Sequence, residues 1–484
     1  MGVRLVIGGE AVGGEEAPYP VRNPVRPAEV VFEAPAASAD QLEVAVISAR
    51  AAQPAWAALD PEERAGLVCA AAGAAAGAVA AGELARLLTR EHGKVLWEAE
   101  FDAGTIGGMA TAYAPLAVEA LVGRSLPGLG GGETSVRHEP FGVVGAILPF
   151  NWPVSVMANK VIPALLTGNT VVMKAPPSCP GAVLAVAAAL AGALPPGVVN
   201  AVNGPGPELG QALVRHSGID MVSFTGGVPA GRSVMAGASA AVKPVILELG
   251  GNDPAVVGPD LAIDAALAGR LLDAAFITSG QVCMAVKRVY VDEGRVGELV
   301  EALVAALAAT VVGDGLEDGV TMGPVHTAAA RDRLEALLAS AEAGGAEVHR
   351  PARIREEDAG QGGYLVSPAI VSGAGPGAAI VREEQFAPAL PVLGYRDIDD
   401  AVAQANDSPF GLCASVWTGD GDLARAVAGR LEAGTVFVNG HGTSAMDYRA
   451  PMGGWKESGY GLELGPEGML AFTRPKTVLV RPGR

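Results

Sequence analysis

The chain has 484 residues, of which 50% are hydrophobic and 18% are charged, so its length predicts more than one domain. Its formal net charge of −18 disfavours binding to nucleic acid or to an anionic membrane surface. Four widely spaced cysteines, Cys69, Cys179, Cys283 and Cys413, form no CxxC pair. This usage excludes a disulfide scaffold and a zinc ribbon, and it favours a reducing, cytoplasmic location with no bound metal.

The amino terminus, MGVRLVIGGE, has no apolar stretch long enough for a secretory signal, so export is not expected. Two uncharged stretches, residues 65–82 and 175–207, approach the length of a membrane span. The first is rich in alanine and glycine and fits a buried helix. The second is broken by prolines, which leaves only a short apolar helix over residues 181–194. We therefore predict no transmembrane segment and no membrane partner.

Short β-branched runs alternate with alanine-rich helical runs, a pattern typical of α/β proteins with a largely parallel sheet. One set comprises VVGAI, TVVMK, VVNAV, MVSFT and VILEL. A second set begins with PAVVG, continues through a helix near residues 263–278 and the strand KRVYVD, and ends at GTVFVNG. The stretches PGLGGGETSVRHEP and TRPKTVLVRPGR lie outside both sets, either as strands of an accessory flap or as linkers. The pattern predicts two wound units of comparable size.

Three reactive side chains lie where these predicted strands end or begin. Asn151 follows an apolar strand, where its amide could donate to a developing oxyanion or cap the next helix. Glu248 is the single carboxylate of an apolar strand, and burial would give it the raised pKa of a general base, unless that strand end is solvated. Cys283 lies on a glycine turn between a helix and a strand, which suits either a nucleophilic thiol or a structural cysteine.

Two further segments suggest a phosphate-containing ligand. Lys174 ends the strand TVVMK ahead of two prolines, which leaves its ammonium free to reach a ligand or the solvent. Gly226, Gly227 and Gly231 open a helix after the strand MVSFT, and glycines at such a turn let a phosphate approach backbone N–H groups. A strict GxGxxG motif is missing, so the motif does not support an ordinary Rossmann dinucleotide site.

Eight segments in chain order resemble the signature segments of the aldehyde dehydrogenase superfamily: PFNWP, VVMK, FTGG, LELGG, GQVC, EEQFAPALPV, NDSPFGL and PMGGWKESGYG. The resemblance covers nearly the whole chain and implies an α/β fold of the aldehyde dehydrogenase type, with three parts. These are a modified doubly wound cofactor-binding domain over residues 1–121 and 141–249 with part of 450–470, a catalytic α/β domain over 250–449, and a small β flap over 122–140 and 471–484. The flap implies assembly into a homodimer or homotetramer.

The resemblance also implies a role for each candidate residue. Cys283 matches the nucleophile, Glu248 the general base, Asn151 the oxyanion donor and Lys160 a lysine that helps carry protons away. The residues implied to bind the cofactor are Phe150, Lys174, Gly226, Gly227, Gly231, Glu384 and Phe386. The implied reaction oxidises an aldehyde with NAD through a cysteine thiohemiacetal and a thioester, which water activated by the glutamate hydrolyses. A coenzyme A-acylating enzyme, which generally lacks that glutamate, and a catalytically silent dinucleotide-binding protein are the alternatives.

Some positions depart from the family pattern or remain unassigned. Pro177 replaces a glutamate of many NAD-preferring members, so the resemblance leaves NADP open as a second cofactor. Arg449 could pair a substrate carboxylate, with a solvated loop arginine as the other interpretation. By analogy with the family, the residues expected to line the substrate tunnel are Val156, Asn159, Thr278, Met284, His441 and Thr443. They are mixed polar and small and do not form an aromatic cage, so a quaternary amine such as betaine aldehyde ranks low as a substrate.

Overall fold

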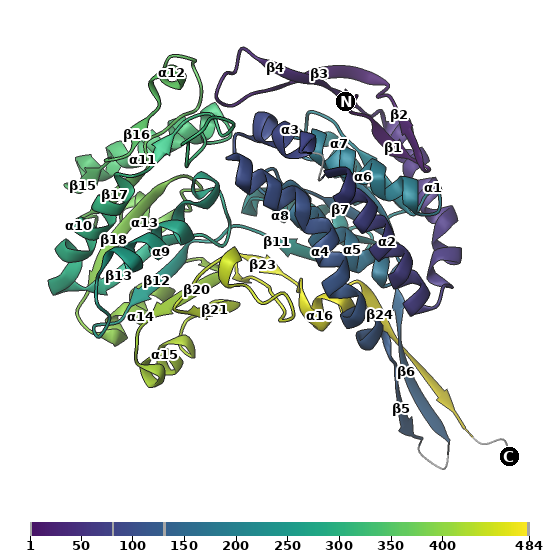
Figure 1. The fold of residues 1–484 in the computed structure, drawn as a ribbon. Helices are drawn as coiled ribbons and strands as arrows, with labels where there is room; N and C mark the ends of the chain where they lie inside the picture. Colours follow the sequence, from purple (N-terminus) through teal and green to yellow (C-terminus); the bar gives the residue numbers. More distant parts are fainter. Residues whose placement is uncertain (1, 80–81, 129–131, 482–484) are drawn as a thin grey trace.

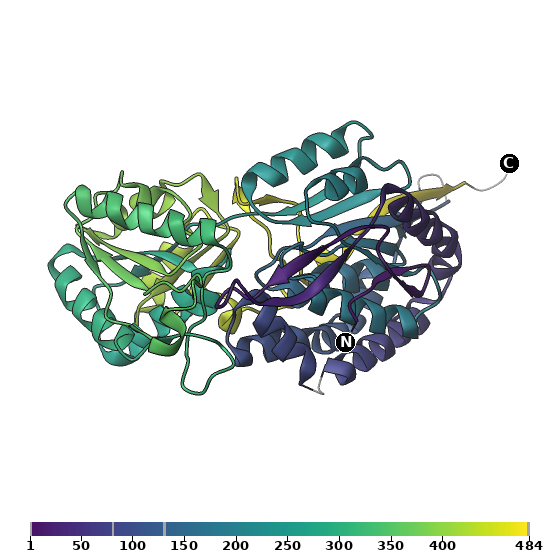
Figure 2. The same cartoon turned by 90° about the horizontal axis from the view of Figure 1, so that it is seen from above.

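The computed structural model describes residues 2–79, 82–128 and 132–481, which form two α/β lobes and a protruding sheet (Figure 1, Figure 2). The first lobe contains an eight-stranded sheet with parallel middle strands and antiparallel edge strands. In spatial order these strands are β2 (Glu10–Val12), β1 (Leu5–Ile7), β9 (Val199–Val202), β8 (Thr170–Lys174), β7 (Val143–Ile147), β10 (Met221–Thr225), β11 (Val245–Glu248) and β23 (Gly459–Tyr460). The first set of predicted strands is therefore confirmed as β7 to β11.

Helices cover both faces of this sheet because successive side chains of its strands enter two different cores. In β8, Val171 and Met173 pack into one core and Val172 into the other. The first face is covered by α2 (Pro61–Val79), α3 (Glu83–His92), α4 (Leu96–Leu121), α5 (Pro153–Leu166) and α6 (Gly181–Ala193), and the second by α1 (Ala39–Ala57), α7 (Glu208–Arg215) and α8 (Val228–Ser239). Within the described residues, no helix is both long and apolar enough to cross a membrane.

The second lobe contains a seven-stranded sheet that is parallel apart from one edge strand. In spatial order its strands are β15 (Glu347–His349), β17 (Ala369–Ser372), β18 (Ala389–Tyr395), β13 (Val286–Asp292), β12 (Asp253–Val257), β20 (Cys413–Trp417) and β21 (Thr435–Val438). One face packs on α9 (Ala265–Phe276) and α10 (Val296–Leu307), the other on α11 (Ala328–Ala343), α13 (Ala379–Arg382), α14 (Ile398–Asn406) and α15 (Gly421–Ala428). The second predicted α/β set is thus confirmed.

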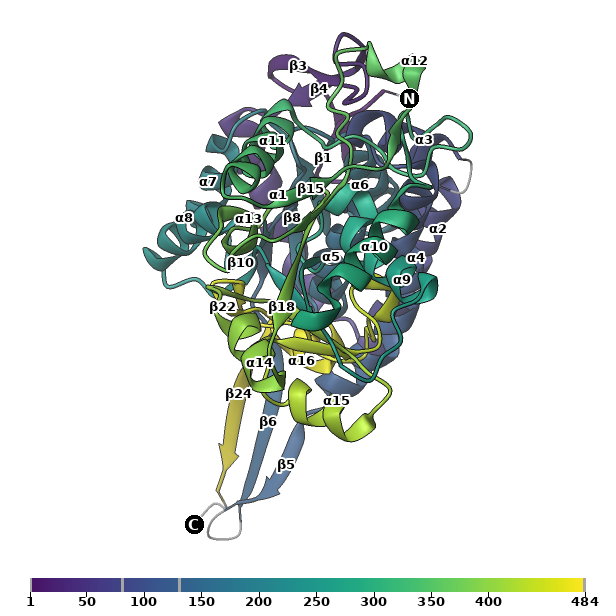
Figure 3. The same ribbon diagram turned by 90° about the vertical axis from the view of Figure 1, so that its left-hand side faces the viewer.

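A three-stranded antiparallel sheet projects away from both lobes (Figure 1, Figure 3). It consists of β5 (Arg124–Pro127), β6 (Glu133–Pro140) and β24 (Thr473–Val480), and β24 pairs with β6 along its whole length. Apolar side chains such as those of Leu126 and Leu479 are exposed on it. Both peripheral stretches therefore contribute strands rather than linkers, while residues 129–131 of the glycine-rich stretch lie outside the described residues.

Short elements complete the two lobes. Three strand pairs are β3 (Glu16–Arg22) with β4 (Val30–Ala36), β14 (Val311–Val312) with β16 (Arg353–Ile354), and β19 (Phe410–Gly411) with β22 (Trp455–Lys456). The short helices are α12 (Glu356–Ala359), α16 (Gly465–Leu470) and the 3-10 turns Ile277–Gly280, Glu293–Arg295 and Thr443–Ala445. Of these, the turn at Ile277–Gly280 leads directly into the segment that carries Cys283.

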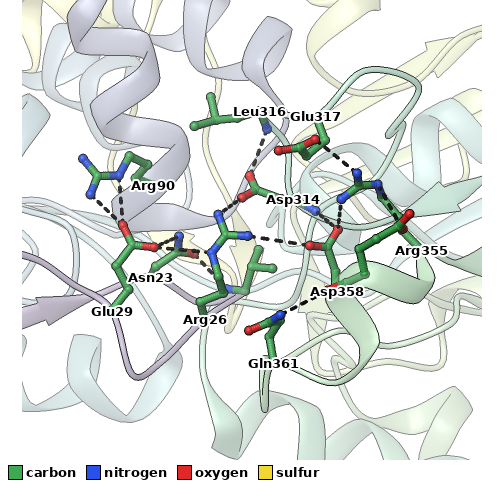
Figure 4. A network of polar contacts seen from close by, with 12 residues as sticks. Asn23, Arg26, Glu29, Arg90, Asp314, Leu316, Glu317, Arg355, Asp358 and Gln361 are labelled. Carbon is green, nitrogen blue, oxygen red and sulfur yellow. Dashed lines mark hydrogen bonds and ion pairs between the residues drawn. The ribbon is translucent and has the colours of Figure 1, made fainter.

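A network of ion pairs joins the connection between β3 and β4 to the second lobe (Figure 4). Arg26 forms ion pairs with two buried carboxylates, those of Asp314 and Asp358. Its Nη1 lies 3.7 Å from Oδ1 of Asp358. Arg355 binds the same Asp358 at 3.3 Å. A buried carboxylate without a partner is costly, so Arg26 stabilises the contact between the two lobes.

Replacing Arg26 with methionine should lower the free energy of unfolding by about 2 kcal/mol, because Asp314 loses its charged partner while Asp358 keeps Arg355. Chemical denaturation followed by circular dichroism measures the change. The matched control is Arg425→Met, whose pair with Asp422 is exposed and should contribute less than about 1 kcal/mol. Equal losses in the two variants would show that Arg26 contributes no more than a surface pair.

Candidate active site

The carboxyl ends of four neighbouring parallel strands, β8, β7, β10 and β11, carry candidate residues side by side. Lys174 is the last residue of β8, Glu248 is the last residue of β11, and Gly226 directly follows β10. Asn151 lies in the loop that follows β7, and Cys283 comes from the second lobe, shortly before β13. Ligands of α/β sheets bind outside this end of the strands, so the fold brings the predicted residues to the expected edge.

Cys283 and Glu248 meet where the two lobes join. They lie close enough for the charge of Glu248 to act on the thiol of Cys283. Burial, together with the carboxyl of Glu463, raises the pKa of Glu248 to about 8. Burial and the charge of Glu248 also raise the pKa of the Cys283 thiol, so it becomes a thiolate when a neighbouring base takes its proton. A carboxyl with a raised pKa next to a thiol is suited to general-base chemistry near neutral pH.

The amide of Asn151 is fixed against the turn that carries Cys283. Its Nδ2 donates to the carbonyl oxygen of Gln281 at 3.0 Å, and the side chain is buried. An amide nitrogen carries two hydrogens, so one N–H remains for a ligand. Among the described residues, the Oδ1 atom of Asn151 has no hydrogen-bond partner. The amide can therefore donate to negative charge that develops on an oxygen bound near Cys283.

The turn before Cys283 is strained. Thr278 and Ser279 have φ angles of 51° and 55°, a region that costs non-glycine residues about 1–3 kcal/mol each. The buried Glu98 holds the turn, because its Oε1 accepts the Thr278 N–H at 2.6 Å. The Oε1 of Gln281 accepts the backbone N–H of His326 at 2.9 Å. Sequence reasoning missed Glu98, since no local pattern on α4 points to a turn so far along the chain.

Lys160 on α5 lies near Glu248 but is held by another carboxylate. Its Nζ donates to Glu463 Oε1 at 2.6 Å and to Ser223 Oγ at 3.1 Å. Both charges act on Glu248, whose pKa is raised by burial first, raised further by Glu463 and lowered by Lys160. Sequence reasoning missed Glu463, which lies 303 residues after Lys160. The charges of the Lys160–Glu463 ion pair therefore act on the carboxyl of Glu248.

A cavity of about 420 Å³ lies at the ends of β7, β8 and β10 and is lined by Lys174, Thr225, Gly226 and Gly227. Gly227 precedes the first turn of α8, and among the described residues no side chain caps that helix, so its N–H groups are available to a ligand. The buried Oγ1 of Thr225 has no partner among the described residues, and burial lowers the pKa of Lys174 to about 8. Glycine backbone, free N–H groups and a lysine fit the adenosine and pyrophosphate of a dinucleotide.

Gly231 lies on α8 but is not among the residues that line this cavity. A β-carbon at this position would collide with the side chain of Leu249. The glycine therefore allows α8 to pack closely against the segment that follows β11.

Glu384, Phe386 and Phe150 gather on the side of the site that faces the second lobe. The Oε1 atom of Glu384 accepts the backbone N–H of Gly251 at 3.0 Å. Phe386 has a φ of +47°, and its ring lies edge-on to Phe150 with the centroids 6.0 Å apart. Phe150 also stacks on His326, with centroids 4.5 Å apart. All three contacts join segments that are far apart in sequence, and they place Phe150 beside Phe386, two residues after Glu384.

Lys287 is a further residue that sequence reasoning missed. Its Nζ donates to the carbonyl oxygens of Val282 at 2.7 Å and Cys283 at 2.8 Å, and it lies 3.9 Å from Glu384. Its charge partly offsets the rise in the Cys283 pKa that burial and Glu248 cause. Lys287 thus fixes the backbone of Cys283 and links it to Glu384.

A second cavity, of about 730 Å³, opens next to Cys283 and is lined by both of its chain neighbours, Val282 and Met284. The expectation of small and polar walls is wrong, since five aromatic side chains line this cavity: Trp97, Phe101, Trp152, Phe276 and Tyr448. Of the predicted tunnel residues, Met284, His441 and Thr443 line it, whereas Val156, Asn159 and Thr278 do not. The aromatic walls come mainly from α4, α9 and the loop before β22, which local patterns did not connect with Cys283.

Comparisons with known proteins agree with this geometry. The model of the aldehyde dehydrogenase family matches residues 12–478. Geranial dehydrogenase from Castellaniella defragrans is 37% identical over 458 residues, which cover 93% of each chain. The crystal structure of betaine aldehyde dehydrogenase from Staphylococcus aureus with NAD+ aligns with a TM-score of 0.93 at 31% identity, covering 99% of this chain and 94% of that one. An NADP-dependent enzyme from E. coli aligns with a TM-score of 0.92 at 32% identity, covering 99% and 98%.

Proposed function

Because the chain belongs to the aldehyde dehydrogenase family, we propose that its NAD(P)-dependent oxidation of an aldehyde to the acid proceeds through a covalent adduct on Cys283. The observation that carries the proposal is the proximity of the Cys283 thiol to the Glu248 carboxyl, whose charge acts on the thiol and whose pKa burial raises to about 8. A nucleophile near a base, with an amide donor close by, forms the constellation that acyl transfer through a thioester requires.

In the proposed reaction Cys283, Asn151 and Glu248 act in turn. Glu248 takes the thiol proton while the Cys283 sulfur bonds to the aldehyde carbon, and the carbonyl oxygen becomes an oxyanion. Asn151 Nδ2 and the backbone N–H of Cys283 donate to that oxyanion, which stabilises charge that is absent in the free aldehyde. When bound, NAD(P)+ supplies the acceptor for the hydride that leaves as the adduct becomes a thioester. Glu248 then deprotonates a water that attacks the thioester carbon, which releases the acid and restores Cys283.

Glu248 must lose the thiol proton before it can activate water. Lys160 and Glu463 are 2.6 Å apart and act on the charge of Glu248, so we assign them to proton removal. No hydrogen bond joins either of them to Glu248 among the described residues, so the transfer requires a bridging water.

The cofactor is assigned to the 420 Å³ cavity and the corner that adjoins it. Lys174 would hold the adenine ribose, the N-terminus of α8 the pyrophosphate, and Glu384 with Phe386 the nicotinamide ribose and ring. Among the described residues, the charged side chains that line this cavity are Lys174 and Arg215, and Pro177 offers no carboxylate to repel a 2′-phosphate. We therefore propose that both NAD and NADP bind.

An aldehyde panel with each cofactor tests the proposal. Geranial, betaine aldehyde, propanal and benzaldehyde would be assayed with NAD+ and NADP+, with and without coenzyme A. The hydrolytic reaction should yield the free acid without coenzyme A, because Glu248 is placed to activate water. Strict dependence on coenzyme A would favour the acylating alternative, and cofactor binding without turnover of any aldehyde would favour the silent binding protein.

Replacing Asn151 with alanine should lower kcat by about 10²–10³-fold, since one of two oxyanion donors is lost. The KM for the cofactor should stay within about twofold, because the amide is assigned to the substrate oxyanion. Steady-state kinetics at saturating cofactor measure both parameters. Asn159→Ala, which lies on α5 eight residues further along the chain and lines neither cavity, is the matched control. An unchanged kcat in Asn151→Ala would remove this residue from the oxyanion site.

The three-part division over the boundaries expected from the sequence remains our proposal. The lobe around the eight-stranded sheet is assigned to cofactor binding, the lobe around the seven-stranded sheet to catalysis, and the projecting sheet to assembly. Exposed apolar residues on that sheet, such as Leu126 and Leu479, support a homodimer or homotetramer. The four cysteines are free thiols, which supports a cytoplasmic location.

A further inference from the structure

Three buried charged side chains lie together at the start of α4. Glu98 and Asp102 are four residues apart, a spacing that places both on one face of the helix, and Lys94 lies two residues before the helix begins. Their exposed fractions are 4%, 0% and 1%, respectively. Lys94 Nζ donates to Asp102 Oδ2 at 2.8 Å. These three residues form the α4 charge row.

Stability alone does not explain a buried row of charges. Removing charged groups from water costs free energy, and a buried ion pair can often be replaced by apolar residues of similar volume without loss of stability. Apolar side chains at these positions would therefore pack α4 equally well. What distinguishes the charges from apolar side chains is the set of polar contacts that they make with other segments.

Two members of the row hold the segment that follows Asn151. Asp102 Oδ1 accepts the backbone N–H of Ser155 at 2.7 Å, in the first turn of α5. The N-cap residue of α5 is Trp152, whose indole can only donate, so it provides no acceptor for that turn. Lys94 Nζ lies over the same indole ring, 4.0 Å from its centroid, in a cation–π contact. Both charges therefore fix the chain directly after Asn151.

The third member holds the segment that precedes Cys283. Glu98 Oε1 accepts the backbone N–H of Thr278 at 2.6 Å, in the turn that has positive φ angles. Such a strained turn persists only where its surroundings hold the backbone. The same segment receives the amide of Asn151, because Asn151 Nδ2 donates to the carbonyl oxygen of Gln281 at 3.0 Å. The α4 charge row thus contacts the segments of both the amide donor and the nucleophile.

We propose that the α4 charge row positions Asn151 relative to Cys283, so that the amide of Asn151 and the backbone N–H of Cys283 donate to the same oxyanion. This inference rests on the oxyanion site proposed above. Lys94, Glu98 and Asp102 are positioning residues, since they act through the backbone and the indole that they hold and not on the aldehyde. A displacement of such a donor by about 1 Å can lower a rate by about 100-fold.

The main test replaces the ion pair by apolar side chains of similar size, in the double variant Lys94→Met, Asp102→Leu. Neither residue is among the described residues that line the 730 Å³ cavity, so direct contacts with the aldehyde stay intact. The variant should fold, because neither partner is left as an unpaired buried charge. Rapid mixing should show a first turnover that is slower by about 10–100-fold, while the Kd for NADH stays within about twofold.

The matched control is Glu100→Leu, at an exposed position of the same helix, whose first turnover should stay within about twofold of the wild-type rate. An unchanged rate in the double variant would overturn the inference. A rate loss accompanied by an equal loss of NADH affinity would also overturn it, because that pattern marks a general disturbance of the structure.

A cycle with Asn151→Ala separates positioning from a purely structural role. If the row acts through Asn151, the double variant should lose no more than about threefold once Asn151 is absent. Equal losses with and without Asn151 would show that the row does not act through this amide, and the inference would then be wrong.

Glu98 supplies a second test that leaves the ion pair in place. Glu98→Gln keeps an oxygen that can accept the Thr278 N–H, so its first turnover at saturating aldehyde should stay within about fivefold of the wild-type rate. Glu98→Leu should slow it at least about tenfold. Equal rates in these two variants would contradict the inference.

The two levels of the account fail in different ways. A slow Asn151→Ala variant beside a normal Lys94→Met, Asp102→Leu variant would refute only the role of the α4 charge row. A normal Asn151→Ala variant would refute the proposed oxyanion site, and the inference that rests on it.

Discussion

Replacing Cys283 with alanine is expected to lower aldehyde-dependent reduction of the cofactor by roughly 10⁴–10⁶-fold, because no covalent adduct can form. The nearest alternative thiol, that of Cys413, is buried in β20, and burial raises its pKa well above the ordinary value for a cysteine. It therefore lacks the access to substrate that replacing Cys283 would require. The initial rate of absorbance change at 340 nm, with saturating aldehyde and cofactor, measures the loss.

The matched control for this variant is Cys69→Ala. Cys69 is partly exposed on α2, its Sγ donates to the carbonyl oxygen of Ala110, and neither residue lines either cavity. Its replacement should leave kcat within about twofold of the wild-type value, since surface-proximal substitutions away from a site usually change little. Cys283→Ala should still bind NADH with a similar Kd. Persistent aldehyde oxidation in Cys283→Ala would show that the nucleophile is another group.

Replacing Glu248 with glutamine is expected to separate the two halves of the reaction. The amide keeps the size of the side chain but cannot take a proton from water, so thioester hydrolysis should slow by about 10²–10⁴-fold. Cys283 would still be acylated once, although more slowly, because ionisation of its thiol then relies on solvent. Rapid mixing should therefore show a burst of reduced cofactor of about one equivalent per site, followed by a slow steady rate.

The activity of the wild-type enzyme is expected to depend on pH through the ionisation of Glu248. Burial raises the pKa of Glu248 to about 8, and the base must be ionised to accept a proton. Activity should therefore rise with pH between about 6.5 and 9 and level off above the pKa. In Glu248→Gln the levelling off near the pKa should disappear, because the slow steady-state rate that remains depends on solvent hydroxide. A wild-type rate independent of pH across that range, or an identical pH profile in the variant, would contradict the assignment of the base.

Local patterns were sufficient to predict the strands and the residues at their ends. TVVMK and MVSFT are short β-branched runs bounded by prolines or glycines, and they became β8 and β10 with Lys174 and Thr225 at the expected edge. Glu248 could be recognised because a lone carboxylate in an apolar strand is conspicuous. In each case the signal lies within a few residues of the feature that it predicts, so it requires no knowledge of the tertiary structure.

Contacts between distant segments could not be predicted in this way. Glu463 pairs with Lys160 across 303 residues, and Glu98 holds Thr278 across 180, and in neither case does the surrounding sequence mark the partner. The walls of the substrate cavity were mispredicted for the same reason. Trp97 on α4 has the pattern of a helix residue, and only the packing of α4 against α5 and the turn before Cys283 brings it to the cavity.

Intact-protein and peptide mass spectrometry of Glu248→Gln, quenched after one turnover with aldehyde and NAD+, tests the account most directly. We expect a mass increase equal to the acyl group of the aldehyde, located on the peptide that contains Cys283 and removed by hydroxylamine, which cleaves thioesters. The double variant Cys283→Ala, Glu248→Gln should show no such increase. An acyl group on any other residue, or full turnover without an adduct in Glu248→Gln, would contradict covalent catalysis by Cys283.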